Sequence, residues 1–177
     1  MKVLGLVGSP RKGSNTDLLV SAVLYGAGAS GHEIDKVYLY DADISACIDC
    51  RTCKKGSCLC VLGDSMKQIY PKLEAADTIV FGTPLYWYGP TGKMKLLLDR
   101  LRPYIASKKL SGKKAILIIP SEEGPQACKC TVEMFEASIK YLEMQFAGKL
   151  LPKAYERAEI KNQPQVLNEA FELGKAL

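Results

Sequence analysis

The sequence contains only one histidine, His32, and no long hydrophobic run. A single histidine excludes a metal site built from several imidazoles and argues against a histidine-based catalytic triad. We expect His32 to be a solvent-exposed residue at the start of a strand. The apolar N-terminal run reaches Gly8 and Pro10 too early for a signal peptide, and no run approaches the length of a membrane span. The sequence therefore predicts a cytoplasmic protein without a membrane partner.

A concentrated basic surface is also missing, because the lysines are scattered along the chain as short pairs. The net charge of +5 is modest, and no basic stripe is interleaved with aromatic residues. The charge pattern therefore predicts no nucleic-acid partner. It suits an anionic ligand such as a phosphate, or an acidic redox partner.

The length and composition predict one globular domain over residues 1–177. Hydrophobic residues make up 47% of the 177 residues, which is enough for a single substantial core. The seven cysteines are an odd number, and disulfides are rare in the cytosol. We therefore expect no disulfide framework.

Five of these cysteines crowd into one short segment. Cys47, Cys50 and Cys53 follow each other in Cys-x-x-Cys steps, and Cys58 and Cys60 come soon after. Zinc sites usually combine one Cys-x-x-Cys pair with a second, distant pair. Consecutive x2 steps on one loop are more typical of a run that binds a [4Fe–4S] cluster. A zinc site and a thiol-rich loop without metal remain the alternatives.

The hydrophobic pattern alternates strands and helices from end to end. Strands are expected over residues 2–8, 33–40, 77–82, 114–120 and 149–155, and helices over 15–29, 64–76, 91–105, 131–146 and from about 165. Five strands alternating with helices predict an α/β fold whose parallel sheet is covered on both faces. Right-handed crossovers favour the strand order 2-1-3-4-5.

The first loop, between Gly8 and Thr16, has the chemistry of a phosphate site. It has the G-x4-G spacing of a Walker A loop, but Ser14 replaces the required lysine, and it lacks the G-x-G-x-x-G dinucleotide pattern. Its short donors and one guanidinium, at the N-terminus of a helix, suit a terminal monophosphate. These donors are Ser9, Arg11, Ser14, Asn15 and Thr16. An ordinary capped strand–helix turn is the alternative.

This loop resembles the FMN-phosphate loop of the flavodoxin-like NAD(P)H-dependent FMN reductases. The segment from Thr83 to Gly89 resembles the second flavin loop of that family, and Lys95 with Asp99-Arg100 resembles its following helix. The cysteine segment, continued by Val61, Asp64 and Met66, resembles the iron–sulfur flavoproteins of the same superfamily. The resemblance covers residues 1 to about 102, and the segment around 121–126 is only loosely similar to the third flavin loop.

The resemblance implies a flavodoxin-like three-layer sandwich that binds FMN. Besides the five donors of the first loop, it assigns FMN contacts to Pro84, Leu85, Tyr86, Trp87, Tyr88, Gly89 and Ser121. Ligands of open α/β sheets lie at the carboxyl ends of the strands, where this second loop begins, and its aromatic residues could flank a flat ring. For one of the three aromatic residues we expect packing in a core or subunit interface instead.

The function that we expect is electron transfer between FMN and a [4Fe–4S] cluster bound by Cys47, Cys50, Cys53 and Cys60. Spacing alone leaves Cys58 and Cys60 open as the fourth ligand, and the resemblance favours Cys60. Neither Cys128 nor Cys130 is expected to be essential for the cluster.

Two alternatives are a cluster-free NAD(P)H-dependent FMN reductase acting on quinones, flavins or nitro compounds, and a flavin- or metal-binding module without turnover. Expected partners are NAD(P)H or a ferredoxin-like electron donor and a small-molecule acceptor. The resemblance also implies a homodimer or homotetramer.

Overall fold

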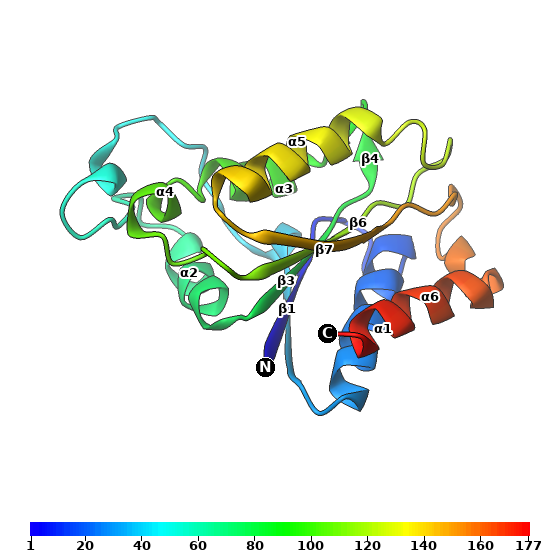
Figure 1. The fold of residues 1–177 in the computed structure, drawn as a ribbon. Helices are drawn as coiled ribbons and strands as arrows, with labels where there is room; N and C mark the ends of the chain where they lie inside the picture. The colour runs from blue at the N-terminus through cyan, green and yellow to red at the C-terminus, as the bar shows by residue number, and fades with distance from the viewer.

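The computed structural model describes residues 1–177, and its centre is a five-stranded parallel sheet (Figure 1). The strands are β1 (Lys2–Val7), β2 (Glu33–Tyr38), β3 (Thr78–Gly82), β6 (Lys114–Ile118) and β7 (Gln145–Leu150). Their order is β2-β1-β3-β6-β7. This is the predicted topology 2-1-3-4-5, because β4 (Leu85–Tyr86) and β5 (Gly89–Pro90) form a separate hairpin that shifts the numbering.

Helices cover both faces of this sheet (Figure 1). On one face lie α1 (Asn15–Ala29) and α6 (Pro164–Lys175); on the other lie α2 (Met66–Ala75), α3 (Gly92–Asp99), α4 (Pro103–Ser107) and α5 (Lys129–Tyr141). Along β1, Val3 and Val7 join the core beneath α1, whereas Leu4 and Leu6 join the core on the opposite face. Alternate side chains of a strand point to opposite faces, so each central strand contributes to two cores. No helix combines the length and apolarity needed to cross a membrane.

Three elements in the second half of the chain differ from the prediction. The helix expected over 91–105 is two helices, because α3 ends at Asp99 and α4 begins at Pro103, whose ring suits the first turn of a helix but not its interior. Helix α5 ends at Tyr141 rather than near 146, and the left-handed Glu143 (φ 59°) follows it. The last strand is β7 rather than 149–155; it is mostly exposed and carries little apolar signal.

His32 precedes β2 as predicted, but it is half-buried rather than exposed.

The carboxyl ends of the central strands are tied together by their loops. The Gly8 N–H donates to the Gly82 carbonyl at 2.7 Å, and the Thr91 hydroxyl donates to the Gly8 carbonyl at 2.6 Å. The Thr83 N–H donates to the Ile118 carbonyl at 3.0 Å. The loops after β1, β3 and β6 therefore meet at one edge of the sheet.

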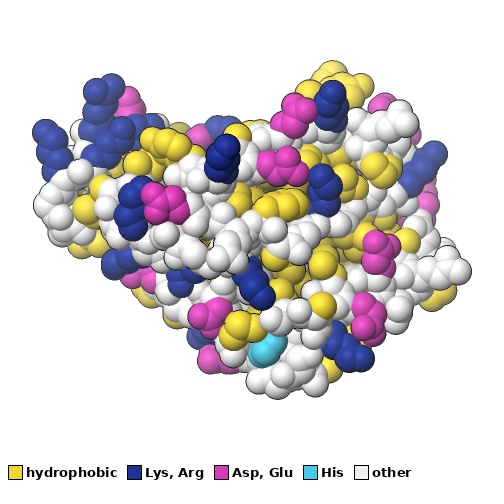
Figure 2. Space-filling view, in the orientation of Figure 1, with side chains coloured by type: hydrophobic (Ala, Val, Ile, Leu, Met, Phe, Trp, Pro, Cys, Tyr) yellow, Lys and Arg dark blue, Asp and Glu magenta, His cyan; other side chains and the backbone are white.

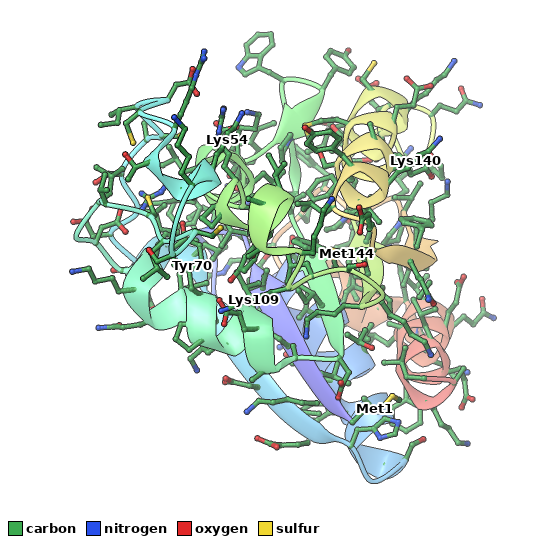
Figure 3. The ribbon with its side chains drawn as sticks, turned by 60° about the vertical axis from the view of Figure 1, so that its left-hand side comes forward. Met1, Lys54, Tyr70, Lys109, Lys140 and Met144 are labelled. Carbon is green, nitrogen blue, oxygen red and sulfur yellow. The ribbon has the colours of Figure 1, made fainter.

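The segment that follows β2, residues 42–65, holds the five clustered cysteines and is called the cysteine loop below. It projects from the sheet as the cyan segment of Figure 1. In the space-filling view, Lys and Arg side chains gather over this projection (Figure 2). The cysteine loop and Met1 lie at opposite ends of the molecule, as the labelled Lys54 and Met1 of Figure 3 show.

Candidate functional site

A cavity of about 210 Å³ lies at the carboxyl ends of β1, β3 and β6. Nine of the twelve residues predicted to contact FMN line it: Ser9, Arg11, Ser14, Asn15, Thr16, Pro84, Leu85, Tyr86 and Ser121. The remaining lining residues are Pro120, Glu122, Ala154 and Tyr155. Trp87, Tyr88 and Gly89 are not among its lining residues. The structure thus gathers most of the predicted set from three separate loops.

The first turn of α1 has the free donors that an anion requires. Ser14 occupies the N-cap position, but its side chain makes no capping hydrogen bond. The N–H groups of Asn15 and Thr16 have no acceptor within the chain, as is usual for the opening N–H groups of a helix. The Thr16 hydroxyl also makes no hydrogen bond, although Thr16 is only 2% exposed. These uncompensated donors, at the positive end of the helix dipole, fit a bound phosphate.

Asn15 has a structural role that the sequence did not reveal. Its amide nitrogen donates to the Glu156 carbonyl at 2.9 Å, and its amide oxygen accepts the Ile160 N–H at 3.2 Å. Ser14 Oγ similarly accepts the Ala158 N–H at 3.3 Å. The side chains of Ser14 and Asn15 therefore fasten the segment 156–160, which is about 140 residues away in the sequence, against the first loop.

Asp17 is a site residue that the sequence reasoning missed. Its carboxylate accepts the Gly13 N–H at 2.7 Å, the Lys36 ammonium at 2.9 Å and the Tyr38 hydroxyl at 3.1 Å. Burial raises the pKa of Asp17, but the Gly13 N–H, Lys36 and Tyr38 together outweigh burial and leave that pKa below its usual value. Gly13 has a φ of +69°, so this bond fixes the left-handed bend of the first loop. In the sequence, Asp17 was visible only as an acidic residue in the first turn of a helix. Nothing in the sequence indicated its contacts with Lys36 and Tyr38.

The second loop is a tight β4–β5 hairpin with Trp87 and Tyr88 at its tip. Both residues have positive φ angles, 50° and 58°, which twist the turn to suit a two-residue hairpin. Trp87 is 97% exposed, and neither Tyr86 nor Tyr88 packs into the core. Trp87 and Tyr88 instead line a second cavity of about 250 Å³, which shares Leu85, Ser121 and Glu122 with the first.

In the cysteine loop, Cys53 is the buried thiol, and Cys47, Cys50 and Cys60 are its neighbours. Burial raises the pKa of Cys53, and the nearby thiols of Cys60, Cys47 and Cys50 raise it further. Cys58 is not among these neighbours; its Sγ lies 3.6 Å from the Gly56 carbonyl oxygen. The N–H and hydroxyl of Thr52 lower the pKa of the exposed Cys50.

The thiols of this loop are neighbours, but they do not form a closed coordination shell. No three side chains of the His, Cys, Asp and Glu types gather closely enough to hold one metal ion. The donor set nevertheless fits an iron–sulfur cluster chemically, since it supplies four thiols from one loop. The loop backbone bends through left-handed residues on both sides of Cys50, at Asp49 (φ 49°) and Arg51 (φ 62°).

The two remaining cysteines lie away from this loop. Cys128 is fully buried, with its Sγ 3.4 Å from the Ser121 hydroxyl, and burial raises the pKa of this thiol. Cys130 is exposed. The structure therefore puts Cys128 beside the first cavity, and the expectation that neither residue is needed for a cluster stays a prediction.

Comparison with known proteins identifies relatives of the chain. Residues 1–152 match the NADPH-dependent FMN reductase family. An iron–sulfur flavoprotein of Methanocaldococcus jannaschii is 36% identical over 128 residues, which are 71% of this chain and 66% of that protein. A Bacillus subtilis protein described as an NAD(P)H-dependent FMN-containing oxidoreductase is 26% identical over 99% of this chain and 97% of its own length. The matches to the iron–sulfur flavoproteins span between about half and two thirds of their lengths.

Solved structures share the fold. The Trp repressor binding protein of Bacillus subtilis superposes with a TM-score of 0.73 at 22% identity, covering 97% of this chain and 96% of that one. A flavodoxin from the domain Archaea gives a TM-score of 0.63 at 15% identity, covering 99% of this chain and 95% of its own. The predicted flavodoxin-like α/β fold is therefore confirmed.

Proposed function

Because the chain belongs to the NADPH-dependent FMN reductase family, we propose that it is an FMN-dependent oxidoreductase with a nicotinamide donor and a small-molecule acceptor. The observation that carries the proposal is the uncapped first turn of α1, whose free N–H groups and hydroxyl line the 210 Å³ cavity. An adenine dinucleotide would present a diester pyrophosphate there, whereas FMN presents a terminal dianion that matches several converging donors.

Seven of the twelve predicted residues then have a physical task. Ser9, Ser14 and Thr16 donate their hydroxyls to the phosphate, and the exposed Arg11 supplies a charged donor at the mouth of the cavity. Pro84, Leu85 and Tyr86 form the wall against which a flat ring packs. FMN itself supplies the chemistry, since it accepts a hydride and releases electrons singly or in pairs. The protein binds the flavin, orients it and screens one side of it from water.

We further propose that the cysteine loop carries a [4Fe–4S] cluster bound by Cys47, Cys50, Cys53 and Cys60. Two observations support this assignment: relatives of 36–37% identity are named iron–sulfur flavoproteins, and Cys53 has the other three thiols as neighbours. These thiols would hold a group that supplies one-electron chemistry beside the two-electron chemistry of the flavin. An exposed basic group on the same loop, Arg51, Lys54 and Lys55, suits an acidic ferredoxin-like partner there (Figure 2).

The cluster-free reductase remains the second candidate. It is favoured by the full-length match to the Bacillus subtilis oxidoreductase, which covers 97% of that protein. Iron and sulfide analysis of anaerobically purified protein separates the two candidates.

A homodimer or homotetramer is also proposed, and sedimentation of the FMN-loaded protein tests it.

The oxidoreductase proposal itself is tested by anaerobic reduction of bound FMN. We expect NADPH or NADH to bleach the flavin absorbance, and a quinone, free flavin or nitro compound to restore it. Bound flavin that neither nucleotide nor a reduced ferredoxin reduces would contradict an enzymatic role and favour a flavin-binding module.

A further inference from the structure

Arg100 is the largest fully buried side chain of the protein and ends α3. Only 1% of its side chain is exposed, and its partner Asp64 is 5% exposed. Arg100 Nη1 lies 2.5 Å from Asp64 Oδ2, and Nη2 lies 3.2 Å from Oδ1, so the pair is bidentate. Arg100 is further fixed through its carbonyl, which accepts the hydroxyl of Tyr70, labelled in Figure 3, at 2.7 Å.

This ion pair closes the neck of the cysteine loop. Arg100 Nη1 also donates to the Ser45 carbonyl at 2.8 Å, just before the first cysteine. Asp64 Oδ2 accepts the Ser45 N–H at 2.9 Å, and Asp64 Oδ1 accepts the Met66 N–H at 3.0 Å, where α2 begins. The two ends of the loop are therefore joined through one guanidinium and one carboxylate.

The same guanidinium contacts one thiol. Arg100 Nη2 donates to Cys60 Sγ at 3.4 Å, whereas Cys58 Sγ donates its hydrogen bond to the Gly56 carbonyl. Arg100 Nε is buried without any partner, so the site bears an unsatisfied polar atom. A buried ion pair is weak evidence for stability, because well-packed apolar residues close a loop equally well. An apolar pair, however, cannot donate a charged hydrogen bond to a sulfur.

We propose that Arg100 is a positioning residue that selects Cys60, rather than Cys58, as the fourth thiolate of the cysteine loop and holds it in place. The inference rests on the proposed cluster, and it deepens that proposal by explaining how five thiols yield one set of four. A hydrogen bond from a fixed donor holds the sulfur of a ligand in one position and orientation. Hydrogen bonds to ligand sulfurs also raise the reduction potential of a cluster.

The chain offers a matched control in Arg102. Its Nη2 lies 2.7 Å from Asp49 Oδ1, so it also binds the cysteine loop, but its side chain is 32% exposed and makes no hydrogen bond to a sulfur. Arg100→Gln and Arg102→Gln therefore each remove one positive charge that is bound to the cysteine loop. Arg100→Lys keeps the charge but loses the planar fork that reaches Asp64, Ser45 and Cys60 together.

The experiment uses anaerobically reconstituted protein and three readouts: iron release to the chelator bathophenanthroline, alkylation of Cys58 and Cys60 followed by peptide mass spectrometry, and FMN affinity as a measure of folding. In the wild type we expect iodoacetamide to label Cys58 and spare Cys60. In Arg100→Gln we expect iron release to be about 10–100-fold faster and Cys60 to be labelled, with FMN affinity unchanged. Arg102→Gln should behave as the wild type.

The outcomes separate this inference from the proposed function. Iron release and Cys60 protection that are unchanged in Arg100→Gln overturn the role of Arg100 while leaving the cluster in place. A wild-type protein that takes up no iron overturns the cluster and this inference together, and FMN binding then still tests the oxidoreductase. If Arg100→Gln misfolds and therefore loses FMN binding, Arg100→Lys is tested in its place. Iron release from Arg100→Lys at the wild-type rate would overturn the role of Arg100.

Discussion

At the scale of single residues, the donors of the first helical turn decide which ligand the cavity can hold. Replacing Thr16 by valine removes from a phosphate one hydroxyl donor that has no partner within the chain, and should cost about 1.5–3 kcal/mol of FMN binding, or about 10–150-fold in Kd. Riboflavin lacks the phosphate and serves as the internal control, with an affinity that should hardly change. Fluorescence titration measures both ligands. Equal losses for FMN and riboflavin would remove the phosphate assignment.

Asn15 is less suitable for this test than the sequence suggests. Its amide holds Glu156 and Ile160, so Asn15→Ala should also loosen the segment after β7 and lower stability. Losses of affinity in that variant would mix two effects.

Asp17 gives the first loop a pH-dependent stability. Its pKa is lowered in the folded protein, so its contribution is present above the unfolded pKa of about 4 and is lost as the pH falls through the lower, folded value. At neutral pH, Asp17→Asn leaves Lys36 without its carboxylate and should lower the free energy of unfolding by about 1–3 kcal/mol. The difference from the wild type should shrink below about pH 4.

Urea unfolding at pH 7 and pH 3.5 measures this difference. Asp41→Asn is the control, because Asp41 pairs with Lys12 at the surface, where both side chains are 56% exposed, and its loss should change stability by less than about 0.5 kcal/mol. An Asp17→Asn deficit that is equal at both pH values would contradict the ionic role.

The residues that the sequence revealed are those with local signals. Ser14 and Thr16 stand in an N-cap context, and the cysteines stand in a recognisable spacing, so both sets could be predicted. Asp17 and Arg100 could not, because their partners lie far away in the sequence: Lys36 is 19 residues from Asp17, and Cys60 is 40 residues from Arg100. Such roles depend on which loops the fold brings together.

At the scale of elements, α1 and α6 approach closely where Gly26 faces Gly174. A Cβ on Gly174 would lie 1.9 Å from the Val23 carbonyl oxygen, and one on Gly26 would lie 1.9 Å from that of Phe171. Gly174→Ala must therefore push the helices apart and should lower the free energy of unfolding by about 1–3 kcal/mol.

Gly28→Ala is the matched control on α1, since its Cβ would meet only the Ile34 side chain at 3.8 Å. That change should be neutral or stabilise by about 0.5–1 kcal/mol. Denaturant midpoints of the two variants check the prediction. Equal midpoints would show that α1 and α6 can move apart without loss of stability.

The β4–β5 hairpin presents Trp87 to solvent beside the cavity. Because Trp87 is 97% exposed, Trp87→Ala should leave folding intact, and its positive φ is no more strained for alanine than for tryptophan. We predict that it weakens FMN binding or shifts the flavin potential. Tyr25→Ala, at an exposed site on α1, is the control. Unchanged affinity and potential in Trp87→Ala would exclude a ring contact.

The sequence predicted all five sheet strands and their order, because buried parallel strands are short apolar runs between helices. It missed the hairpin, whose two-residue strands have no periodicity, and it extended α3 through Pro103. It also displaced β7, an edge strand whose exposed side chains carry no burial pattern.

At the scale of the whole molecule, the two proposed centres lie at the same end of the sheet and are connected through α3. Thr91, just before α3, holds the first loop at Gly8, and Arg100, just after it, holds the cysteine loop. The helix has eight residues and is therefore only about 12 Å long. A flavin in the cavity and a one-electron carrier on the cysteine loop would therefore be linked through a single short helix.

The cofactor content of protein purified without oxygen, measured by visible absorption together with FMN, iron and sulfide analysis, tests the proposed function most directly. We expect one FMN for each protein chain, and iron and inorganic sulfide in equal amounts to each other. FMN without iron would leave a cluster-free reductase. Protein that retains no FMN, and binds none when FMN is added, would exclude an FMN-dependent oxidoreductase.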